Sequence, residues 1–144
     1  MSQMIFVNLP VADVAKATAF YAALGFTKDD RFSAEHASSM QLSDTIVFML
    51  LDRDFFRTFT PKPIADAHAT TEVLLALSRD SREAVDEIVD KAAAAGGKID
   101  IREKQDLGFM YSRSFEDLDG HIFEPLHMNL DAFLAAGDAA HEHA

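Results

Sequence analysis

The stretch MIFVNLPVADVAKATAFYAALGF at residues 4–26 decides the fold, because it holds a strand, a helix start and a helix end in succession. Its apolar run at residues 4–9 ends at Pro10 and predicts a strand. Asp13 can cap a following helix and Gly25 can end it. The helix has an apolar face at helical spacing, formed by Val14, Ala17, Phe20, Tyr21 and Leu24.

The same order of elements then occurs twice along the chain. Strand-like runs follow the first helix at about residues 27–33, 37–42 and 45–51. A strand at Glu72–Leu77 opens the second half, and Asp80 with Glu83 forms a capping box for a helix that ends at Gly96 and Gly97. Three further strands are expected at about residues 98–103, 108–115 and 121–128. Both halves therefore have the order β-α-β-β-β.

This repeat predicts one α+β domain over residues 1–144. Its expected parts are a first module at about 3–52, a linker at about 53–69 with a short helix at 53–58, a second module at about 70–128 and a tail at about 129–144 that begins as a helix. Gene duplication is one explanation of the repeat, and a chance ordering of a common α+β pattern is the other.

Composition excludes several classes of function. The net charge of −11 and the absence of a basic stripe argue against nucleic acid and anionic membrane surfaces as partners. No cysteine is present, which excludes disulfides and thiolate chemistry. No signal peptide is indicated and the longest apolar run, residues 46–51, is too short for a membrane helix, so a cytoplasmic location is expected.

Motifs at both ends of the repeat resemble one superfamily. Val11-Ala12-Asp13, Ala19-Phe20-Tyr21 and Leu24-Gly25-Phe26 are similar to the opening signature of the vicinal oxygen chelate (glyoxalase/bleomycin-resistance/extradiol dioxygenase) proteins. Asp117-Leu118-Asp119-Gly120 followed by Glu124 is similar to their closing D-P-D-G-x-x-x-E motif, with Leu118 in place of the usual proline. Other stretches resemble a lactoylglutathione lyase-like bacterial branch of the superfamily. The resemblance covers roughly residues 4–128.

The resemblance implies a more specific architecture than the pattern does. It implies that the two modules form an open, cup-like mixed barrel with the helices outside and a ligand cavity inside. It also implies a homodimer, and a divalent metal ion held by His or Glu on the first and last strands of each module.

The first module lacks those metal ligands. The position that carries His in relatives falls on Phe6, and the usual Glu position falls on Met49. Neither side chain offers a hard oxygen ligand, and Asn8, on the same strand face as Phe6, offers only a weak amide oxygen. Phe6, Asn8 and Met49 are therefore expected to contact a substrate instead.

The second module keeps two carboxylates, Glu72 at its first strand and Glu124 at its last. Three interpretations are open. The pair holds a divalent cation completed by water, or shares a proton so that one glutamate acts as a general base. Alternatively, Glu124 hydrogen-bonds backbone or an arginine while Glu72 lies in solvent.

Tyr111 and Arg113 share a strand face in the second module. If they face inward they can bind an anionic ligand, and if outward they pair with acidic surface. The histidines are expected to be structural or solvated, with His68 or His36 the better candidates for the site and His121, His127, His141 and His143 the poorer ones.

Two functions follow. The first is a glyoxalase-like lyase or isomerase acting on a small oxygenated substrate, with Glu72 and Glu124 as base or ligands. The second is a non-catalytic small-molecule binding or resistance protein. The incomplete ligand set argues against a standard glyoxalase I, whose reaction uses the metal to stabilise negative charge on oxygen.

Overall fold

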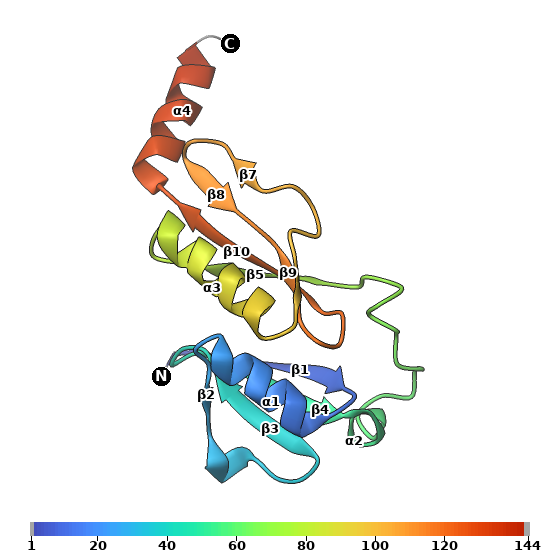
Figure 1. Ribbon diagram of the computed structural model, residues 1–144. Helices are drawn as coiled ribbons and strands as arrows, with labels where there is room; N and C mark the ends of the chain where they lie inside the picture. Colours follow the sequence, from blue (N-terminus) through green and yellow to red (C-terminus); the bar gives the residue numbers. More distant parts are fainter. Residues whose placement is uncertain (1, 143–144) are drawn as a thin grey trace. The chain divides into compact units, whose positions relative to one another are not determined.

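The computed structural model describes residues 2–142, with side chains as far as residue 137. Within them the chain divides into two compact units, residues 2–72 with 117–121, and residues 73–116 with 122–142. Each unit is an α+β module with its own sheet and helix (Figure 1). The predicted α+β class and the repeated βαβββ order are confirmed.

The first unit follows the order predicted from residues 4–26. Its elements are β1 (Ile5–Val11), α1 (Val14–Ala23), β2 (Thr27–Lys28), the 3-10 turn η1 (Asp30–Phe32), β3 (Ala37–Gln41), β4 (Ile46–Asp52) and α2 (Arg53–Arg57). The sheet order is β1-β4-β3-β2, with β1 parallel to β4 and the other pairs antiparallel. The strand expected over 27–33 is shorter, because Asp29 accepts the amide of Arg31 and turns the chain into η1.

Helix α1 covers one face of this sheet. The Asp13 side chain accepts the amide of Lys16, so the predicted cap is present. Buried Phe20 and Tyr21 meet Phe26 and Phe48 in an aromatic core, with ring centroids of Tyr21 and Phe26 5.2 Å apart. Because Phe48 and Leu50 alternate with Val47 and Met49 along β4, the latter lie on the face away from α1.

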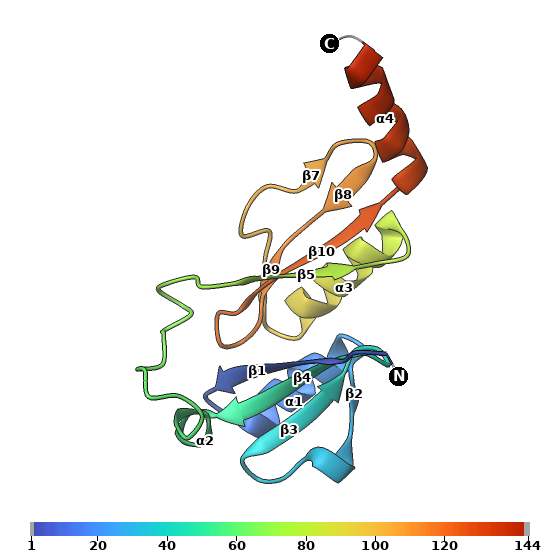
Figure 2. The same cartoon turned by 180° about the vertical axis from the view of Figure 1, so that it is seen from behind.

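The second unit is built around its last long strand. Its elements are β5 (Leu74–Ser78), α3 (Arg82–Ala94), β6 (Lys98–Ile99), β7 (Gln105–Asp106), β8 (Met110–Ser112), β9 (Phe115–Glu116), β10 (Ile122–Met128) and α4 (Leu130–Glu142). Strand β10 pairs with β5 in parallel and with both β8 and β9 antiparallel (Figure 2). The strand predicted at 108–115 is therefore two short strands, interrupted at residues 113 and 114.

Helix α3 covers one face of the second sheet. Its cap is Ser81, whose hydroxyl accepts the amide of Ala84, and not the expected Asp80. Phe115 and Phe123 stack in parallel on neighbouring strands, 5.1 Å apart, and both are fully buried. The buried face of the helix is formed by Val85, Ile88, Val89 and Ala92, as the spacing predicts.

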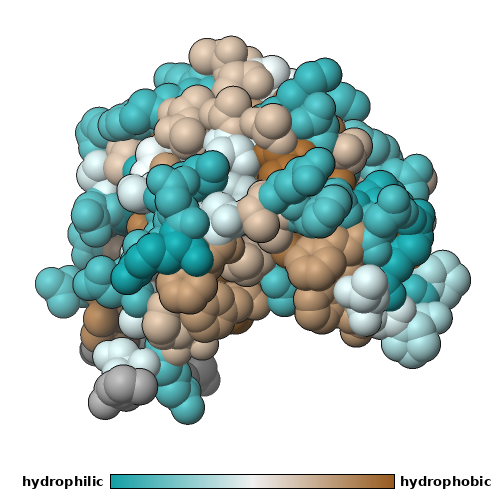
Figure 3. Space-filling view, turned by 90° about the horizontal axis from the view of Figure 1, so that it is seen from below, coloured by the Kyte–Doolittle hydropathy of each residue, from teal (hydrophilic) through white to brown (hydrophobic). Residues whose placement is uncertain are grey.

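The faces of the sheets away from the helices keep apolar side chains at the surface. Phe6 on β1 and Leu74 on β5 are 55% and 56% exposed. Apolar surface between hydrophilic residues is visible in Figure 3. No helix among the described residues is long and apolar enough to span a membrane.

Candidate functional site

Glu124 lies on the face of the second sheet that α3 does not cover. Strand alternation places buried Phe123 toward the helix and Glu124 on the opposite face. In the register with β5, Glu124 stands beside Ala76. Leu74, Ala76, Ile122 and Leu126 share this open face, and the antiparallel registers add Ser112 and Glu116 to it. The carboxylate therefore stands on a face that carries both apolar and polar side chains.

Arg102 neutralises this carboxylate. Its Nε and Nη2 both donate to Glu124 Oε2, at 3.0 and 2.6 Å. The side chain of Glu124 is 18% exposed and that of Arg102 is 35% exposed, so water reaches the pair only in part. The other oxygen, Glu124 Oε1, accepts no hydrogen bond from any residue that the structure describes.

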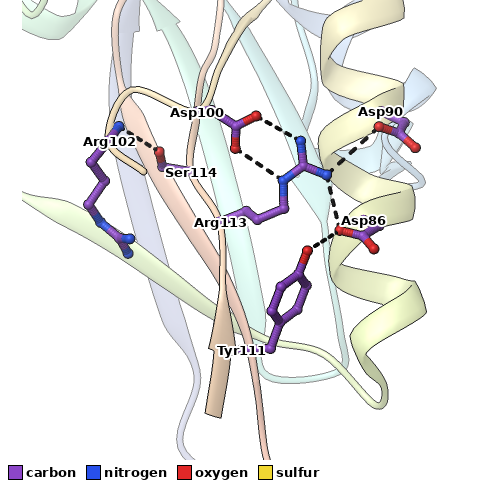
Figure 4. Close-up of polar contacts among 7 residues, drawn as sticks. All are labelled: Asp86, Asp90, Asp100, Arg102, Tyr111, Arg113 and Ser114. Carbon is purple, nitrogen blue, oxygen red and sulfur yellow. Dashed lines mark hydrogen bonds and ion pairs between the residues drawn. The ribbon is translucent and has the colours of Figure 1, made fainter. Parts of the chain in front are cut away.

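Two serines and a carbonyl fix the position of Arg102. Nη2 also donates to the hydroxyl of buried Ser112, at 3.1 Å, and Nη1 donates to the carbonyl of Glu103, at 3.1 Å. The amide of Arg102 donates to Ser114 Oγ at 3.4 Å (Figure 4). A side chain from an irregular segment is thereby held on the sheet in one orientation.

Arg113 lies on the other face of the sheet, toward α3. It donates to both oxygens of Asp100, at 3.1 and 2.9 Å, and to Asp86 at 3.0 Å (Figure 4). The hydrogen bonds that Arg113 donates to Asp100 raise the pKa of Arg113 and lower the pKa of Asp100. Asp100 has a φ of +52°, in the left-handed region that non-glycine residues seldom adopt. Arg113 thus binds the carboxylate of a turn residue, and the chain continues from this turn to Arg102.

Tyr111 shares that helix-side face. Its hydroxyl donates to Asp86 Oδ1 at 2.6 Å, and this bond is the main cause that lowers the pKa of Asp86. Asp86, Asp90, Asp100, Glu103 and Lys104 surround Tyr111 and Arg113 in an open hollow of about 770 Å³. The two residues therefore pair with acidic side chains, the outward arrangement considered from the sequence.

The remaining predicted site residues lie in the first unit or at its end. Glu72 is exposed and precedes β5, which begins at Leu74. Asn8 pairs with Met49 between β1 and β4, and both lie with Phe6 on the face away from α1. Phe6 and Asn8 are exposed and Met49 is half-buried. The three are thus together on one surface, as expected from alternation.

The Asp117 motif forms a turn within the first unit. Buried Asp117 accepts the Tyr21 hydroxyl at 2.5 Å on Oδ2 and the amides of Asp119 and His121 on Oδ1, both at 2.9 Å. Asp119 Oδ1 in turn accepts the amide of Ala12 at 2.8 Å. The opening and closing motifs are therefore joined by hydrogen bonds.

Burial dominates the electrostatics of this turn. It raises the pKa of Asp117, although the charge of His121 and the Tyr21 hydrogen bond oppose the shift. It also raises the pKa of Tyr21 well above its usual value, aided by the Asp117 charge. Gly120 has a φ of +89°, and a Cβ there would lie 2.8 Å from the carbonyl carbon of Ala67. These motif residues have structural roles.

Three of the histidine rings have local partners. His36 Nδ1 lies 2.7 Å from Asp52 Oδ2, His121 Nε2 lies 2.8 Å from the Pro10 carbonyl, and His127 Nδ1 lies 3.0 Å from the Arg79 carbonyl. The amide of exposed His68 donates to Asp66. His143 falls outside the described residues, and so does the side chain of His141.

The donor set does not fit the divalent metal that the resemblance implies. Within the described chain no three His, Cys, Asp or Glu side chains converge in the way a metal site requires. Glu124 has a guanidinium on Oε2, and a cation beside it would meet that positive charge. Phe6 and Met49 offer no hard oxygen.

Arg102 was not found from the sequence. It lies between β6 and β7, in a segment without periodicity, and only the three-dimensional structure brings it to Glu124, 22 residues later. Two serines, Ser112 and Ser114, lie at alternating positions and so on the same sheet face as Glu124. They were the sequence feature that indicated a polar partner on this face.

These modules and motifs define a vicinal oxygen chelate fold, and comparison with known families agrees. The model of the Glyoxalase/Bleomycin resistance protein/Dioxygenase superfamily matches residues 3–124. The chain belongs to this superfamily. A comparison with curated protein sequences finds no significant match.

Solved structures support the same fold. A hypothetical protein from S. aureus is 29% identical, with a TM-score of 0.73 over 88% of this chain and 94% of that one. A glyoxalase/bleomycin resistance protein/dioxygenase family enzyme from Burkholderia phytofirmans PsJN is 19% identical, with a TM-score of 0.72 over 88% and 99%. A glyoxalase-related enzyme from Fulvimarina pelagi is 18% identical, with a TM-score of 0.73 over 88% of each chain.

Proposed function

We propose that the protein binds a small oxygenated organic molecule on the open face of its second sheet, without converting it. One observation carries this proposal. Glu124 Oε2 is fixed by Arg102 while Oε1 keeps its hydrogen-bonding capacity, on a face that also carries the apolar side chains of Leu74, Ile122 and Leu126. A few oriented polar groups among apolar ones are typical of small-molecule sites.

The ion pair also suggests what kind of molecule binds. Glu124 and Arg102 together carry no net charge, and the whole chain carries −11. A ligand that is itself anionic would meet repulsion from the chain, whereas a neutral hydroxyl can donate to Oε1. The favoured class is therefore a neutral compound with a hydroxyl group and an apolar part.

Methyl NMR spectroscopy tests this proposal. Neutral α-hydroxy ketones serve as probes. We expect a hydroxy ketone to shift the methyl signals of Ile122 and Leu126, and Glu124→Gln to weaken that binding about tenfold, the cost of one hydrogen bond to a charged group. Glu87→Gln, an equal change of charge on the exposed face of α3, should leave binding unchanged.

Shifts confined to residues outside the open face, or equal affinities of the two glutamine variants, would refute the proposal.

A second function is favoured by the same free oxygen. A carboxylate with one oxygen held and the other available can remove a proton next to a carbonyl group, as in an isomerase. We propose hemithioacetal isomerisation as the reaction to assay. Turnover that Glu124→Gln abolishes and Glu87→Gln retains would establish the enzyme, whereas probe binding without turnover would establish the binding protein.

We also propose that the protein forms a homodimer and acts in the cytoplasm. Strand β1 is an edge strand whose exposed residues include Ile5 and Phe6, and apolar edges of this kind favour association. Sedimentation velocity over a range of concentrations tests the dimer. A monomer at every concentration would refute it.

A further inference from the structure

We infer that the Arg102 guanidinium takes the place of a divalent cation at Glu124, so that ligand binding on this face needs no metal. The inference rests on the proposed function for its ligand, but the absence of a metal requirement at Glu124 is testable without one. It begins from the donor set: Glu124 is paired with Arg102, and no group of three or more His, Cys, Asp or Glu side chains converges there among the residues that the structure describes.

The contacts of Arg102 are those of a fixed cation. Nε and Nη2 both donate to one oxygen of Glu124, and the guanidinium is further held by Ser112 and by the carbonyl of Glu103. An arginine guanidinium stays protonated throughout the physiological pH range. It therefore supplies a permanent positive charge beside the carboxylate, as a metal ion would.

The surroundings keep this charge in one position. The guanidinium contacts Ser112, which is 3% exposed, and the Arg102 amide donates to Ser114, which is 1% exposed. Two residues earlier, the two carboxylate oxygens of Asp100 accept from Nε and Nη2 of Arg113. The segment that carries Arg102 is thus attached to the sheet on both of its faces.

The arrangement also leaves a donor for a ligand. Nε has one hydrogen, both hydrogens of Nη2 are taken by Glu124 and Ser112, and Nη1 uses one of its two for Glu103. The second Nη1 hydrogen can donate to a ligand oxygen while Glu124 Oε1 accepts from a ligand hydroxyl. Two oxygens of one molecule can therefore be bound without a chelated ion.

Mn²⁺ titration with methyl NMR detection tests the metal part, with no ligand added. Mn²⁺ is a hard, paramagnetic cation that broadens the signals of nearby groups. We expect no selective broadening of the Ile122 and Leu126 methyls in the wild-type protein. Broadening of those methyls that Glu124→Gln abolishes would overturn the inference.

The arginine part is tested with the hydroxy ketone probe in a chelator. We expect unchanged affinity when the chelator is added and a loss of about tenfold or more in Arg102→Met, with partial recovery in Arg102→Lys. Arg82→Met, which removes the Arg82–Asp106 ion pair of the same unit, is the matched control and should bind normally. Circular dichroism verifies that each variant is folded.

The outcomes separate this inference from the proposed function. If no probe binds and Mn²⁺ leaves the Ile122 and Leu126 methyls sharp, the proposed function fails while the replacement of the metal at Glu124 stands. If a probe binds only when metal is present, or binds Arg102→Met as tightly as the wild type, the inference fails while the binding function stands.

Discussion

The hydrogen bond from Tyr21 to Asp117 makes a quantitative prediction about stability. Tyr21→Phe removes the only proton donor to Asp117 Oδ2 among the described residues, while the amides of Asp119 and His121 still bind Oδ1. Asp117 is 5% exposed and Tyr21 is fully buried, so water does not replace the lost hydroxyl. Hydrogen bonds to charged groups contribute about 1.5–3 kcal/mol. We expect the free energy of unfolding to fall by about 2–3 kcal/mol at neutral pH.

The loss of unfolding free energy in Tyr21→Phe should increase from acid to neutral pH. Burial raises the pKa of Asp117, so the folded protein keeps its proton at pH values where the unfolded chain has lost it. The contribution of Asp117 to stability is therefore present at low pH and lost as the pH rises through this window. The Tyr21 hydrogen bond opposes that loss by favouring the carboxylate. The deficit of Tyr21→Phe should consequently grow from acid to neutral pH.

Urea unfolding at several pH values measures both effects. Tyr111→Phe is the matched control, because its hydroxyl also donates to an aspartate, but Asp86 is 46% exposed and retains Arg113 as a partner. Its cost should be less than about 1 kcal/mol. Equal costs for the two variants, or a Tyr21→Phe deficit that shrinks as the pH rises, would refute the reasoning.

Two further predictions concern the turns of the first unit. Gly120→Ala should lower the free energy of unfolding by about 2 kcal/mol or more, because its Cβ would meet the backbone of Ala67 and His68 at a φ of +89°. Gly25→Ala, at a φ of +102° with nothing within 4 Å, should cost about 1 kcal/mol, and thermal unfolding that ranks the two in the reverse order would contradict the steric argument. The hydrogen bond to Asp52 raises the pKa of His36, so Asp52→Asn should move the midpoint of the His36 NMR titration to lower pH. The stabilisation from this pair should be complete below the unfolded pKa of histidine and lost as the pH rises through the folded pKa.

Regular periodicity made most of the fold predictable. Helices α1 and α3 bury the faces that the spacing of their apolar residues indicates. Alternation along β10 places Glu124 and Phe123 on opposite faces of the sheet. The exceptions lie where local hydrogen bonds override the pattern. Asp29 turns the chain after β2, and the hydroxyl of Ser81 takes the cap expected of Asp80.

The candidate site was predictable only in part, because one of its two charges comes from an irregular segment. Glu124 follows from the closing motif, but nothing in the local sequence around Arg102 indicates its partner. The pairing depends on Asp100 adopting a positive φ and on Arg113 holding it there from the opposite face of the sheet. Such tertiary contacts leave no periodic pattern in the sequence.

The closing motif has two physical tasks that depend on each other. The amide of Asp117 donates to the carbonyl of His121 at 3.0 Å, which closes the turn between β9 and β10. That turn sets the register in which Ile122 pairs with both Glu116 and Leu74. A shift by one residue would move Glu124 into the place of buried Phe123 and bring a phenyl ring to the open face. The buried aspartate therefore determines on which face the glutamate meets Arg102, although it contacts neither.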